Sequence, residues 1–323
     1  MDAPPLPQAF LSRRFPAPTE TQLKARYCLR VNTDDSILKP DAIAERAKGA
    51  SVLFVTATEQ VDETLIKALS PSLKAIATLS VGHDHIDLNA ARAFGIRVLH
   101  TPDVLSDACA EIAMMLVLNA CRRGFEADRM VRTGNWPGWA PTQLLGKGLV
   151  GANLCILGMG RIGRAIATRA RAFGMQIQYH NRNRLSAQLE GDAIFHASLE
   201  GMLACADVLV IAAPGSAQAK GSINETRLSC LPEGAVVVNI SRGDIVDDNA
   251  LISALESGRI FAAGLDVFAN EPEIDPRYRS LPNVFLTPHI GSATRETRDA
   301  MGWLLIDGLD KLSKGDLPSN LIV

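Results

Sequence analysis

The chain has 323 residues, more than one hydrophobic core usually organises, and we therefore expect two domains. Its residues are 47% hydrophobic and 21% charged, which is typical of a globular protein and excludes a largely disordered one. The formal net charge of -2 gives no electrostatic basis for binding a nucleic-acid backbone or an anionic membrane, so it favours a small-molecule partner.

The N-terminal stretch MDAPPLPQAFLSRRFPAP carries prolines where a secretory signal needs an apolar run. We expect it to be a flexible or loosely packed arm without an assigned function; a proline-rich recognition ligand is the alternative. No later segment is long and apolar enough to span a bilayer, and we expect a cytoplasmic protein. The six cysteines lack the paired spacings of a zinc site or a disulfide framework, so we expect buried thiols and no metal.

Between residues 25 and 101, short apolar runs alternate with helix-like segments. The runs are RYCLRV, SVLFVT, LKAIATLS and IRVLH. Because strands that alternate with helices form parallel sheets, this part of the chain predicts an α/β domain.

Apolar residues cover nearly every face of the helix predicted from Ser106, SDACAEIAMMLVLNACRR. Ile112, Met115, Leu116 and Asn119 form only part of the surface that it must bury. An interdomain core helix and a subunit interface explain this pattern equally well, so a homodimer is one expectation. The segment NWPGWAPTQLLGKGL that follows is rich in Gly, Pro and Trp and predicts a long ordered connection.

The alternation of strand and helix patterns begins again at Asn153. Its apolar runs are NLCILG, MQIQYH, ADVLVIAAP, GAVVVNIS, IFAAGLDV and NVFLTP. They predict a second α/β unit with a doubly wound sheet. Residues 295–315 have the pattern of one amphipathic helix, which could return to the first domain.

A glycine-rich turn, GMGRIG, follows the first of these runs and precedes a helix pattern. Gly158 permits a tight turn, Gly160 lets the backbone approach a pyrophosphate, and Gly163 allows close helix packing. The N–H groups of Arg161 and Ile162 at the helix start would bind the phosphates. The context of strand, turn, helix and second strand predicts a dinucleotide site, but the turn does not distinguish NAD, NADP and a flavin.

The strand after this helix ends in HNRNR, where a dinucleotide fold usually places an acid for the ribose hydroxyls. Asn181 stands at about that position and is neutral. Arg182, and Arg184 as a second candidate, can pair with a 2'-phosphate. We expect NADP(H) to be the preferred coenzyme with NAD(H) also accepted; two arginines on a solvated loop are the alternative interpretation.

Ligands of open α/β sheets collect beyond the carboxyl ends of the strands. Arg242 follows one apolar run there and can hold a carboxylate in bidentate fashion while polarising the neighbouring carbonyl. His289 can deliver a proton as hydride reaches carbon. Glu271 would accept the other imidazole N–H and favour the charged ring. These three residues supply what reduction of a 2-oxo acid requires.

Two further strand ends complete the candidate site. The backbone N–H groups at Val81 and Gly82 could bind a substrate carboxylate as a small nest. Asp266 could receive the nicotinamide carboxamide. Loop residues of these types are often merely solvated, and histidines are often structural. We treat five histidines as structural or rim residues: His83, which adjoins Gly82 of the candidate site, and His85, His100, His180 and His196.

Four motifs in order, GMGRIG, VNISRGDIVDDNAL, GLDVFANEP and LTPHIGSAT, resemble the D-isomer-specific 2-hydroxyacid dehydrogenase family. The resemblance implies two doubly wound parallel-sheet α/β domains with the active site in the cleft between them. A flavodoxin-like substrate domain would comprise residues 1–101 and 291–323, and a Rossmann-like NAD(P)-binding domain residues 102–290. The family roles match the catalytic residues Arg242, Glu271 and His289 and the coenzyme contacts Gly158, Gly160, Gly163 and Asp266.

Within the family, the motifs SVGHDHID, GWAPTQLLG and YHNRNR look most like glyoxylate/hydroxypyruvate reductases. This implies NADPH-dependent reduction of glyoxylate to glycolate and of hydroxypyruvate to D-glycerate, with His289 as the proton donor. Trp139 corresponds to a tryptophan that in some relatives reaches the partner subunit's active site, and Ser292 of the LTPHIGSAT motif is counted with the substrate contacts. A dehydrogenase for another D-2-hydroxy acid and a coenzyme-sensing corepressor on the same fold are the alternatives. The sequence leaves open the physiological 2-oxo acid and whether the oligomer is a dimer or a tetramer.

Overall fold

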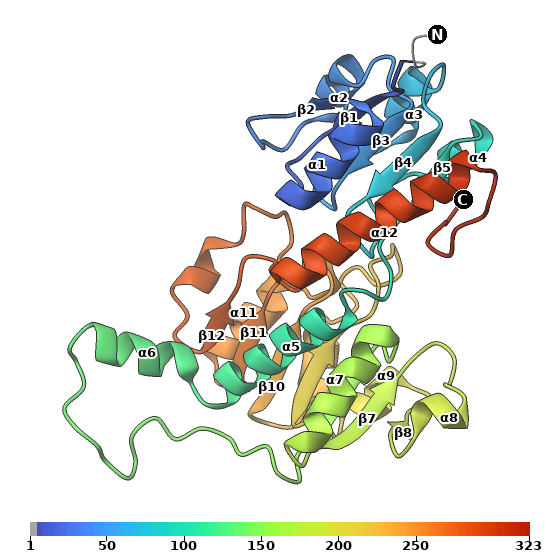
Figure 1. The fold of residues 1–323 in the computed structure, drawn as a ribbon. Coiled ribbons are helices and arrows are strands. Elements are labelled where there is room, and N and C mark those ends of the chain that lie inside the picture. Colours follow the sequence, from blue (N-terminus) through green and yellow to red (C-terminus); the bar gives the residue numbers. More distant parts are fainter. Residues whose placement is uncertain (1–4) are drawn as a thin grey trace. The chain divides into compact units, whose positions relative to one another are not determined.

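The computed structural model describes residues 5–323, and the chain divides into two compact units (Figure 1). Unit 1 combines the chain up to Leu105 with Ser292–Val323, and unit 2 is Ser106–Gly291. The expected boundaries, after residues 101 and 290, differ from these by four residues and one residue. Both units are mixed α/β with a parallel sheet, as the sequence predicted.

Unit 1 is built on a five-stranded parallel sheet in the order β2-β1-β3-β4-β5, the flavodoxin-like order. Its strands are β1 (Gln8–Leu11), β2 (Cys28–Val31), β3 (Val52–Val55), β4 (Ala75–Thr78) and β5 (Arg97–Leu99). Its helices are α1 (Ala17–Arg26), α2 (Pro40–Arg46), α3 (Glu63–Leu69), α4 (Leu88–Ala93) and α12 (Arg295–Ser313).

The expectation of a loosely packed N-terminal arm is wrong for the residues that the structure describes. β1 lies between β2 and β3, with Ala9 opposite Val52 and Leu11 opposite Phe54. Ala9, Phe10 and Leu11 are all buried. The prolines that suggested an arm flank this short apolar run without interrupting it, so they cost no ladder hydrogen bond. Residues 1–4 of the expected arm lie outside the described residues.

Helix α12 belongs to unit 1, where it packs on α1. Gly302 permits this close contact, because a Cβ atom there would lie 2.0 Å from Thr19 Oγ1. Arg26 of α1 also pairs with Asp310 of α12 at 3.3 Å. The amphipathic helix at residues 295–315 therefore returns to the N-terminal part of the chain, as its pattern suggested.

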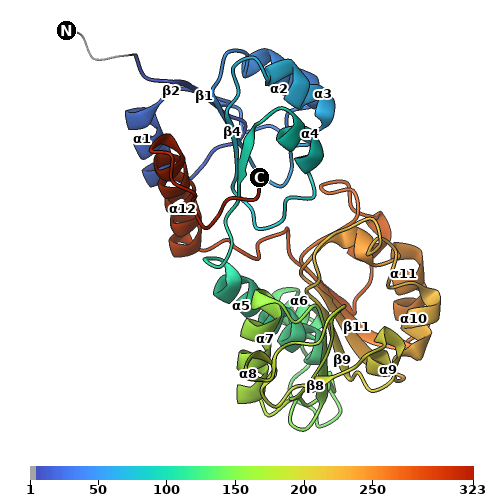
Figure 2. The same cartoon turned by 90° about the vertical axis from the view of Figure 1, so that its right-hand side faces the viewer.

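Unit 2 is built on a seven-stranded parallel sheet in the order β12-β11-β10-β9-β6-β7-β8. Figure 2 labels β11, β9 and β8 of this sheet. Its strands are β6 (Asn153–Leu157), β7 (Gln176–His180), β8 (Ile194–Phe195), β9 (Val208–Ile211), β10 (Ala235–Asn239), β11 (Ile260–Leu265) and β12 (Val284–Leu286). Its helices are α5 (Ser106–Cys121), α6 (Gly124–Arg132), α7 (Arg161–Ala172), α8 (Ala187–Glu190), α9 (Leu199–Leu203), α10 (Glu225–Cys230) and α11 (Asp248–Glu256).

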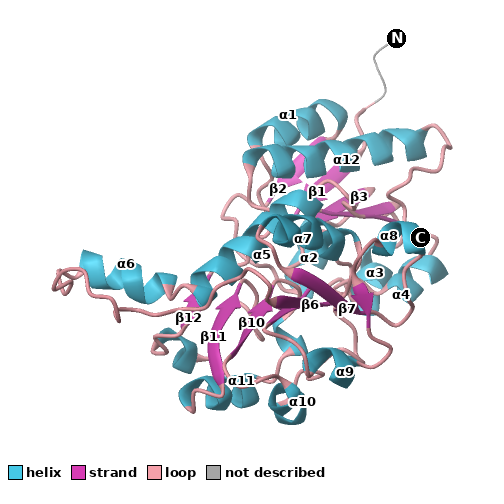
Figure 3. Ribbon diagram, turned by 90° about the horizontal axis from the view of Figure 1, so that it is seen from below, coloured by secondary structure: helices cyan, strands magenta, loops and turns pink. Residues whose placement is uncertain are grey.

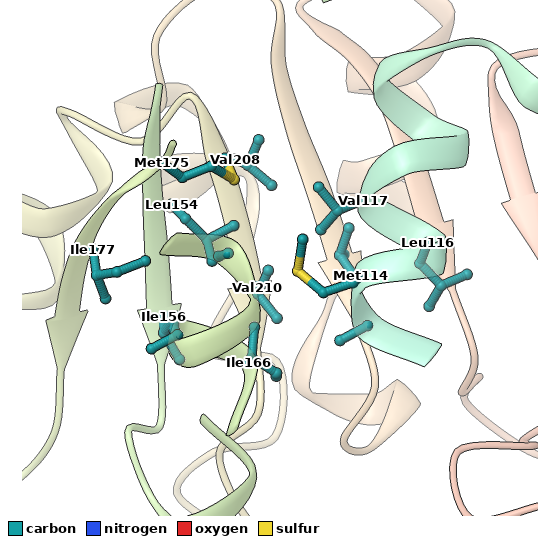
Figure 4. Close-up of a cluster of buried hydrophobic side chains, with 14 of the residues drawn as sticks. Met114, Leu116, Val117, Leu154, Ile156, Ile166, Met175, Ile177, Val208 and Val210 are labelled. Carbon is teal, nitrogen blue, oxygen red and sulfur yellow. The ribbon is translucent and has the colours of Figure 1, made fainter. Parts of the chain in front are cut away.

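Helix α5 is a core element of unit 2. Figure 4 shows Met114 and Val117 pointing from this helix toward Val210 of β9, with Leu116 on another side. The α5 backbone comes so close to β11 that a Cβ atom on Gly264 would lie 2.8 Å from Leu116 Cβ. The hydrophobic core of unit 2 therefore accounts for most of the apolar surface of α5, for which the sequence offered an interdomain core and a subunit interface as explanations.

Helix α6 and the connection after it are the least covered part of unit 2. α6 has no buried residue, and the chain from 133 to 152 forms neither helix nor strand. Figure 3 shows both segments extending away from the sheet of this unit. Trp136, Trp139, Leu145 and Val150 are exposed on the connection. Among the described residues, no helix is long and apolar enough to cross a membrane, and no cluster of side chains suits a metal ion.

Candidate active site

The glycine-rich turn follows β6, and its three glycines meet different surroundings. Gly158 has a φ of +100°, and a Cβ atom on it would lie 2.5 Å from Ala213 N. On Gly163, a Cβ atom would lie 2.3 Å from Gly158 O. On Gly160 it would meet nothing within 4 Å. The fold itself requires the first and third glycines, whereas the second borders open space, as a pyrophosphate site needs.

Helix α7 begins directly after this space. Gly160 is its N-cap and supplies no side-chain cap, so the first turn of the helix presents backbone N–H groups such as that of Ile162 to this space. The positive end of the helix dipole adds to their attraction for an anion. These groups fit the phosphates of a dinucleotide.

Asn181, at the end of β7, connects this strand to the turn. Its Oδ1 accepts a hydrogen bond of 2.7 Å from the N–H of Met159, between the first two glycines. The sequence indicated Asn181 only as a neutral residue of the coenzyme site and missed this bond, because the motif does not specify which way the side chain points.

Arg184 is held inside its own loop. Its Nε and Nη2 donate to the buried carboxylate of Glu190, the closest contact being 2.9 Å, and its guanidinium lies 5.8 Å from the ring centre of Phe195. Tyr179 Oη also donates to Glu190 at 2.8 Å. The charge of Arg184 is thus directed at Glu190, whose pKa it holds below the usual range. This weakens the case for Arg184 as a phosphate ligand.

Arg182, by contrast, is exposed and forms no ion pair within the described part of the chain. Glu190 is the residue that the sequence interpretation missed. Its partner stands six residues away across a loop, and no motif marks such a pair. Arg182 therefore remains the cation of this loop that is available to a ligand.

His289 and Glu271 come together on the loops that follow β12 and β11. The Nδ1 atom of His289 lies 2.8 Å from Glu271 Oε2, while Glu271 Oε1 accepts the N–H of Phe268 at 2.8 Å. Burial alone would raise the pKa of the Glu271 carboxyl, but the hydrogen bond and charge of His289, the Phe268 N–H and Arg242 together hold that pKa below its ordinary value. The carboxylate is therefore ionised and fixes the orientation of the ring.

Arg242 follows β10 and is half-buried. Its carbonyl oxygen accepts a bond of 2.9 Å from Asn239 Nδ2, and its Nη1 donates to Ser241 O at 2.8 Å. The next residue, Gly243, packs so tightly on the loop after β11 that a Cβ atom would lie 1.8 Å from the carbonyl carbon of Phe268. The three predicted catalytic residues thus occupy adjoining loops at the carboxyl edge of one sheet.

Asp266 is only 1% exposed and holds the segment that carries His289. Its carboxylate accepts the Thr287 hydroxyl at 2.7 Å and the N–H groups of Ile290 and Gly291 at 2.8 Å each. Burial raises its pKa, although these hydrogen bonds act in the opposite direction. The sequence suggested a nicotinamide contact at this position. Asp266 also fixes the chain on both sides of His289 through these hydrogen bonds, and the sequence did not indicate this role.

The remaining predicted substrate contacts are divided between the units. Val81, Gly82 and Ser292 belong to unit 1, and the Ser292 carbonyl accepts bonds from Thr294 N and Arg298 Nε. Trp139 belongs to unit 2 and is 83% exposed.

The five histidines that were set aside all have partners inside their own unit. His85 lies 3.0 Å from Thr78 Oγ1, and His100 contacts the Val81 carbonyl and the ring of His83. His180 is hydrogen-bonded to the carbonyl oxygen of His196, and the ring of His196 is hydrogen-bonded to the side chain of Gln178. These contacts agree with structural roles.

Comparison with known proteins adds three findings. The model of a family described as "D-isomer specific 2-hydroxyacid dehydrogenase, NAD binding domain" matches residues 114–291. A glycerate dehydrogenase of Hyphomicrobium methylovorum is 40% identical over 305 residues, which cover 93% of this chain and 95% of that protein. A Polaromonas protein of known crystal structure, described as a member of the same family, is 65% identical in sequence to this chain. The two structures have a TM-score of 0.94, and the match covers 99% of this chain and 100% of that one.

A solved structure with a named activity is also similar. It is an NADPH-dependent glyoxylate/hydroxypyruvate reductase of Sinorhizobium meliloti, in complex with NADP and malonate. It is 33% identical, with a TM-score of 0.88, and covers 98% of this chain and 97% of that one.

Proposed function

Because the chain belongs to the D-isomer specific 2-hydroxyacid dehydrogenase family, we propose that it reduces small 2-oxo acids with NADPH, glyoxylate to glycolate and hydroxypyruvate to D-glycerate. The observation that carries this proposal is the 2.8 Å hydrogen bond between His289 and Glu271 in the unit that also contains the glycine-rich turn. A paired acid of this kind favours an enzyme over a coenzyme-sensing module. The family itself accounts for the nicotinamide coenzyme and for the class of substrate.

When bound at the glycine-rich turn, NADPH would supply the hydride that reduces the carbonyl carbon. Arg242 binds the substrate carboxylate and polarises the carbonyl, so it acts on the ground state and the transition state. His289 donates its Nε2 proton to the carbonyl oxygen as the hydride arrives, which leaves a neutral imidazole and a 2-hydroxy acid. Glu271 accepts the Nδ1–H and orients the ring, so that Nε2 faces the substrate.

The substrate contacts from unit 1 would be the N–H groups of Val81 and Gly82, with Ser292 as a further contact. Backbone N–H groups in a nest bind a carboxylate without adding a charge. Asp266 would contact the nicotinamide end of the coenzyme as well as hold the His289 segment.

The preference for NADPH rests on the loop after β7. Asn181 is neutral where an acid would repel a 2'-phosphate, and Arg182 is exposed beside it. A charge-assisted hydrogen bond contributes roughly 1.5–3 kcal/mol, and after a discount for exposure we expect a preference of about tenfold or more. The Sinorhizobium reductase with its bound NADP supports this choice of coenzyme.

The test is a steady-state assay of NADPH and NADH oxidation with glyoxylate, hydroxypyruvate, pyruvate and 3-phosphohydroxypyruvate. We expect the highest kcat/KM with NADPH and the first two acids. His289→Ala should lower kcat by roughly 10²–10⁴, because the positioned acid is removed. A variant that keeps wild-type turnover would contradict the role of His289, and a higher kcat/KM with NADH would contradict the coenzyme preference.

We further propose a cytoplasmic homodimer that assembles through α6 and the connection after it. This segment exposes a set of large apolar side chains, and Trp139 would reach the active site of the partner subunit. Sedimentation should give twice the monomer mass, and Trp139→Ala should raise the KM for the 2-oxo acid. A monomeric wild-type protein with full activity would exclude this arrangement.

A further inference from the structure

The segment after β4 in unit 1 has an unusual pattern of hydrogen bonds. The carbonyl oxygens of Ser80, Val81 and Gly82 each accept a hydrogen bond from a group in unit 1. Thr101 N donates to Ser80 O at 2.9 Å, His100 Nδ1 to Val81 O at 2.9 Å, and the hydroxyl of Ser80 to Gly82 O at 2.7 Å. Among the described residues, the N–H groups of Val81, Gly82 and His83 find no acceptor.

The planarity of the peptide bond links these two observations. In a trans peptide, the N–H of one residue points away from the C=O of the residue before it. The bond from His100 to Val81 O therefore sets the direction of the Gly82 N–H. In the same way, Thr101 sets the Val81 N–H, and the Ser80 hydroxyl sets the N–H of His83. The three free donors are aimed by the groups that hold the opposite side of each peptide.

His100 is itself fixed by a segment distant in sequence. Its N–H donates to Asn320 O at 3.1 Å, and its carbonyl accepts from Asn320 Nδ2 at 3.0 Å. Asn320 is 1% exposed and also donates to Leu304 O of α12 at 3.2 Å. The imidazole of His100 thus has a supported backbone, and its bond to Val81 O requires the proton on Nδ1.

Ser80 stands at the end of a buried relay. Its hydroxyl lies 2.7 Å from Thr78 Oγ1, which lies 3.0 Å from His85 Nε2. Since Ser80 gives its only proton to Gly82 O, Thr78 donates to Ser80 and His85 donates to Thr78. Each of these three donors thus has a single acceptor, and this arrangement keeps the Ser80 hydroxyl directed at the Gly82 carbonyl.

We propose that His100 and Ser80 are positioning residues that aim the N–H groups of Gly82 and His83 at the substrate carboxylate, which adds the His83 N–H to the nest of Val81 and Gly82. This inference rests on the proposed 2-oxo acid reductase and adds to it the residues that shape its carboxylate nest. Neither side chain touches the substrate. Both act by holding a carbonyl on the far side of a peptide, so they affect substrate binding more than the chemical step.

The experiment compares substitutions that keep shape with substitutions that keep the donor. His100→Phe retains a ring without the Nδ1 donor, whereas His100→Asn places an amide N–H at about the position of Nδ1. Ser80→Ala removes the second donor, and Ser80→Thr keeps it. His196→Phe, a partly buried and hydrogen-bonded histidine of unit 2, is the matched control.

We expect His100→Phe and Ser80→Ala each to raise the KM for glyoxylate by roughly three- to tenfold, the effect of one net hydrogen bond. The KM for NADPH and the shape of the pH profile should stay as in the wild type. His100→Asn and Ser80→Thr should restore the glyoxylate KM to within about twofold, and His196→Phe should leave it unchanged.

An unchanged glyoxylate KM in both His100→Phe and Ser80→Ala, with an active wild type, would overturn this inference and leave the proposed function standing. The same holds if the donor-keeping variants fail to restore the KM although they unfold at the wild-type temperature. If His100→Phe does not fold, Ser80→Ala decides alone. A wild type that reduces no 2-oxo acid would instead refute the proposed function.

Discussion

A hydrogen bond joins His289 to Glu271, and its strength depends on the negative charge of Glu271. Because its folded-state pKa lies below the ordinary value of about 4.3, Glu271 stabilises the fold at every pH above that value. The contribution is lost only as the pH falls through the lowered pKa. The carboxylate is therefore ionised whenever the enzyme is assayed near neutral pH.

We predict that Glu271→Gln lowers the reduction rate across the assayed pH range. The carboxylate is ionised throughout that range, and the neutral amide removes the negative charge that pairs with His289. The measurement is kcat/KM for hydroxypyruvate between pH 5 and 10, with the fold checked by circular dichroism. Profiles that superimpose would mean that the two residues are not coupled in the reaction.

Arg182 provides a second test at this scale. Arg182→Ala should raise the KM for NADPH about tenfold or more and leave that for NADH nearly unchanged, because only NADPH carries the 2'-phosphate. The effect should shrink in high salt, which screens exposed charges. Arg277→Ala, an exposed arginine of the same unit that pairs with Asp275, is the charge-matched control. Equal effects on both coenzymes would refute a 2'-phosphate contact.

At the scale of elements, the strand–turn–helix of β6 and α7 separates the needs of folding from those of binding. Gly160→Ala adds a Cβ where nothing lies within 4 Å, so the free enzyme should keep its stability while NADPH binds more weakly. Gly163→Ala places a Cβ 2.3 Å from Gly158 O and should destabilise the fold by roughly 1–3 kcal/mol. Urea unfolding with and without NADP+ measures both. A destabilised Gly160→Ala protein without coenzyme would contradict this division.

Most elements followed from the sequence because their signals are local. A buried run such as Val208–Ile211 is apolar throughout, and the turn after β6 carries its own glycines. β1 escaped prediction because its short run stands among prolines, and only its pairing with β2 and β3 makes it a strand.

Part of the candidate site could not be predicted for a related reason. Residue types and strand ends indicated Arg242, Glu271 and His289, but not the partners of the side chains around them. The hydrogen bonds that Ile290 and Gly291 donate to Asp266, and that Arg184 donates to Glu190, depend on the path of each loop. No pattern of residue types determines such a path.

At the scale of the whole molecule, each hydrophobic cluster that residues 5–323 form belongs to one unit or the other. One lies in unit 1, and two lie in unit 2 on the strands and helices around the glycine-rich turn. Trp303 of α12 is in unit 1, whereas Trp136 and Trp139 are in unit 2. Replacing the latter two by Phe leaves one fluorescent reporter for unit 1.

We predict that NADP+ at about 100 times its Kd stabilises unit 2 by about 2.7 kcal/mol and leaves the Trp303 transition in place, since the coenzyme contacts that we propose lie in unit 2. Thermal unfolding followed by circular dichroism and by Trp303 fluorescence gives the two readings. A Trp303 transition that rises in parallel with the far-UV signal would mean that both units unfold as one cooperative body.

The return of α12 to unit 1 sets the order in which the chain can fold during synthesis. The strands of unit 1 leave the ribosome first, yet the face of α1 that receives Gly302, and the backbone of His100 that receives Asn320, wait for residues 292–323. At 5–20 residues per second, the 186 residues of unit 2 impose a delay of roughly 10–40 seconds. During that time unit 2 can close its sheet, while the part of the chain made first keeps apolar surface open to chaperones.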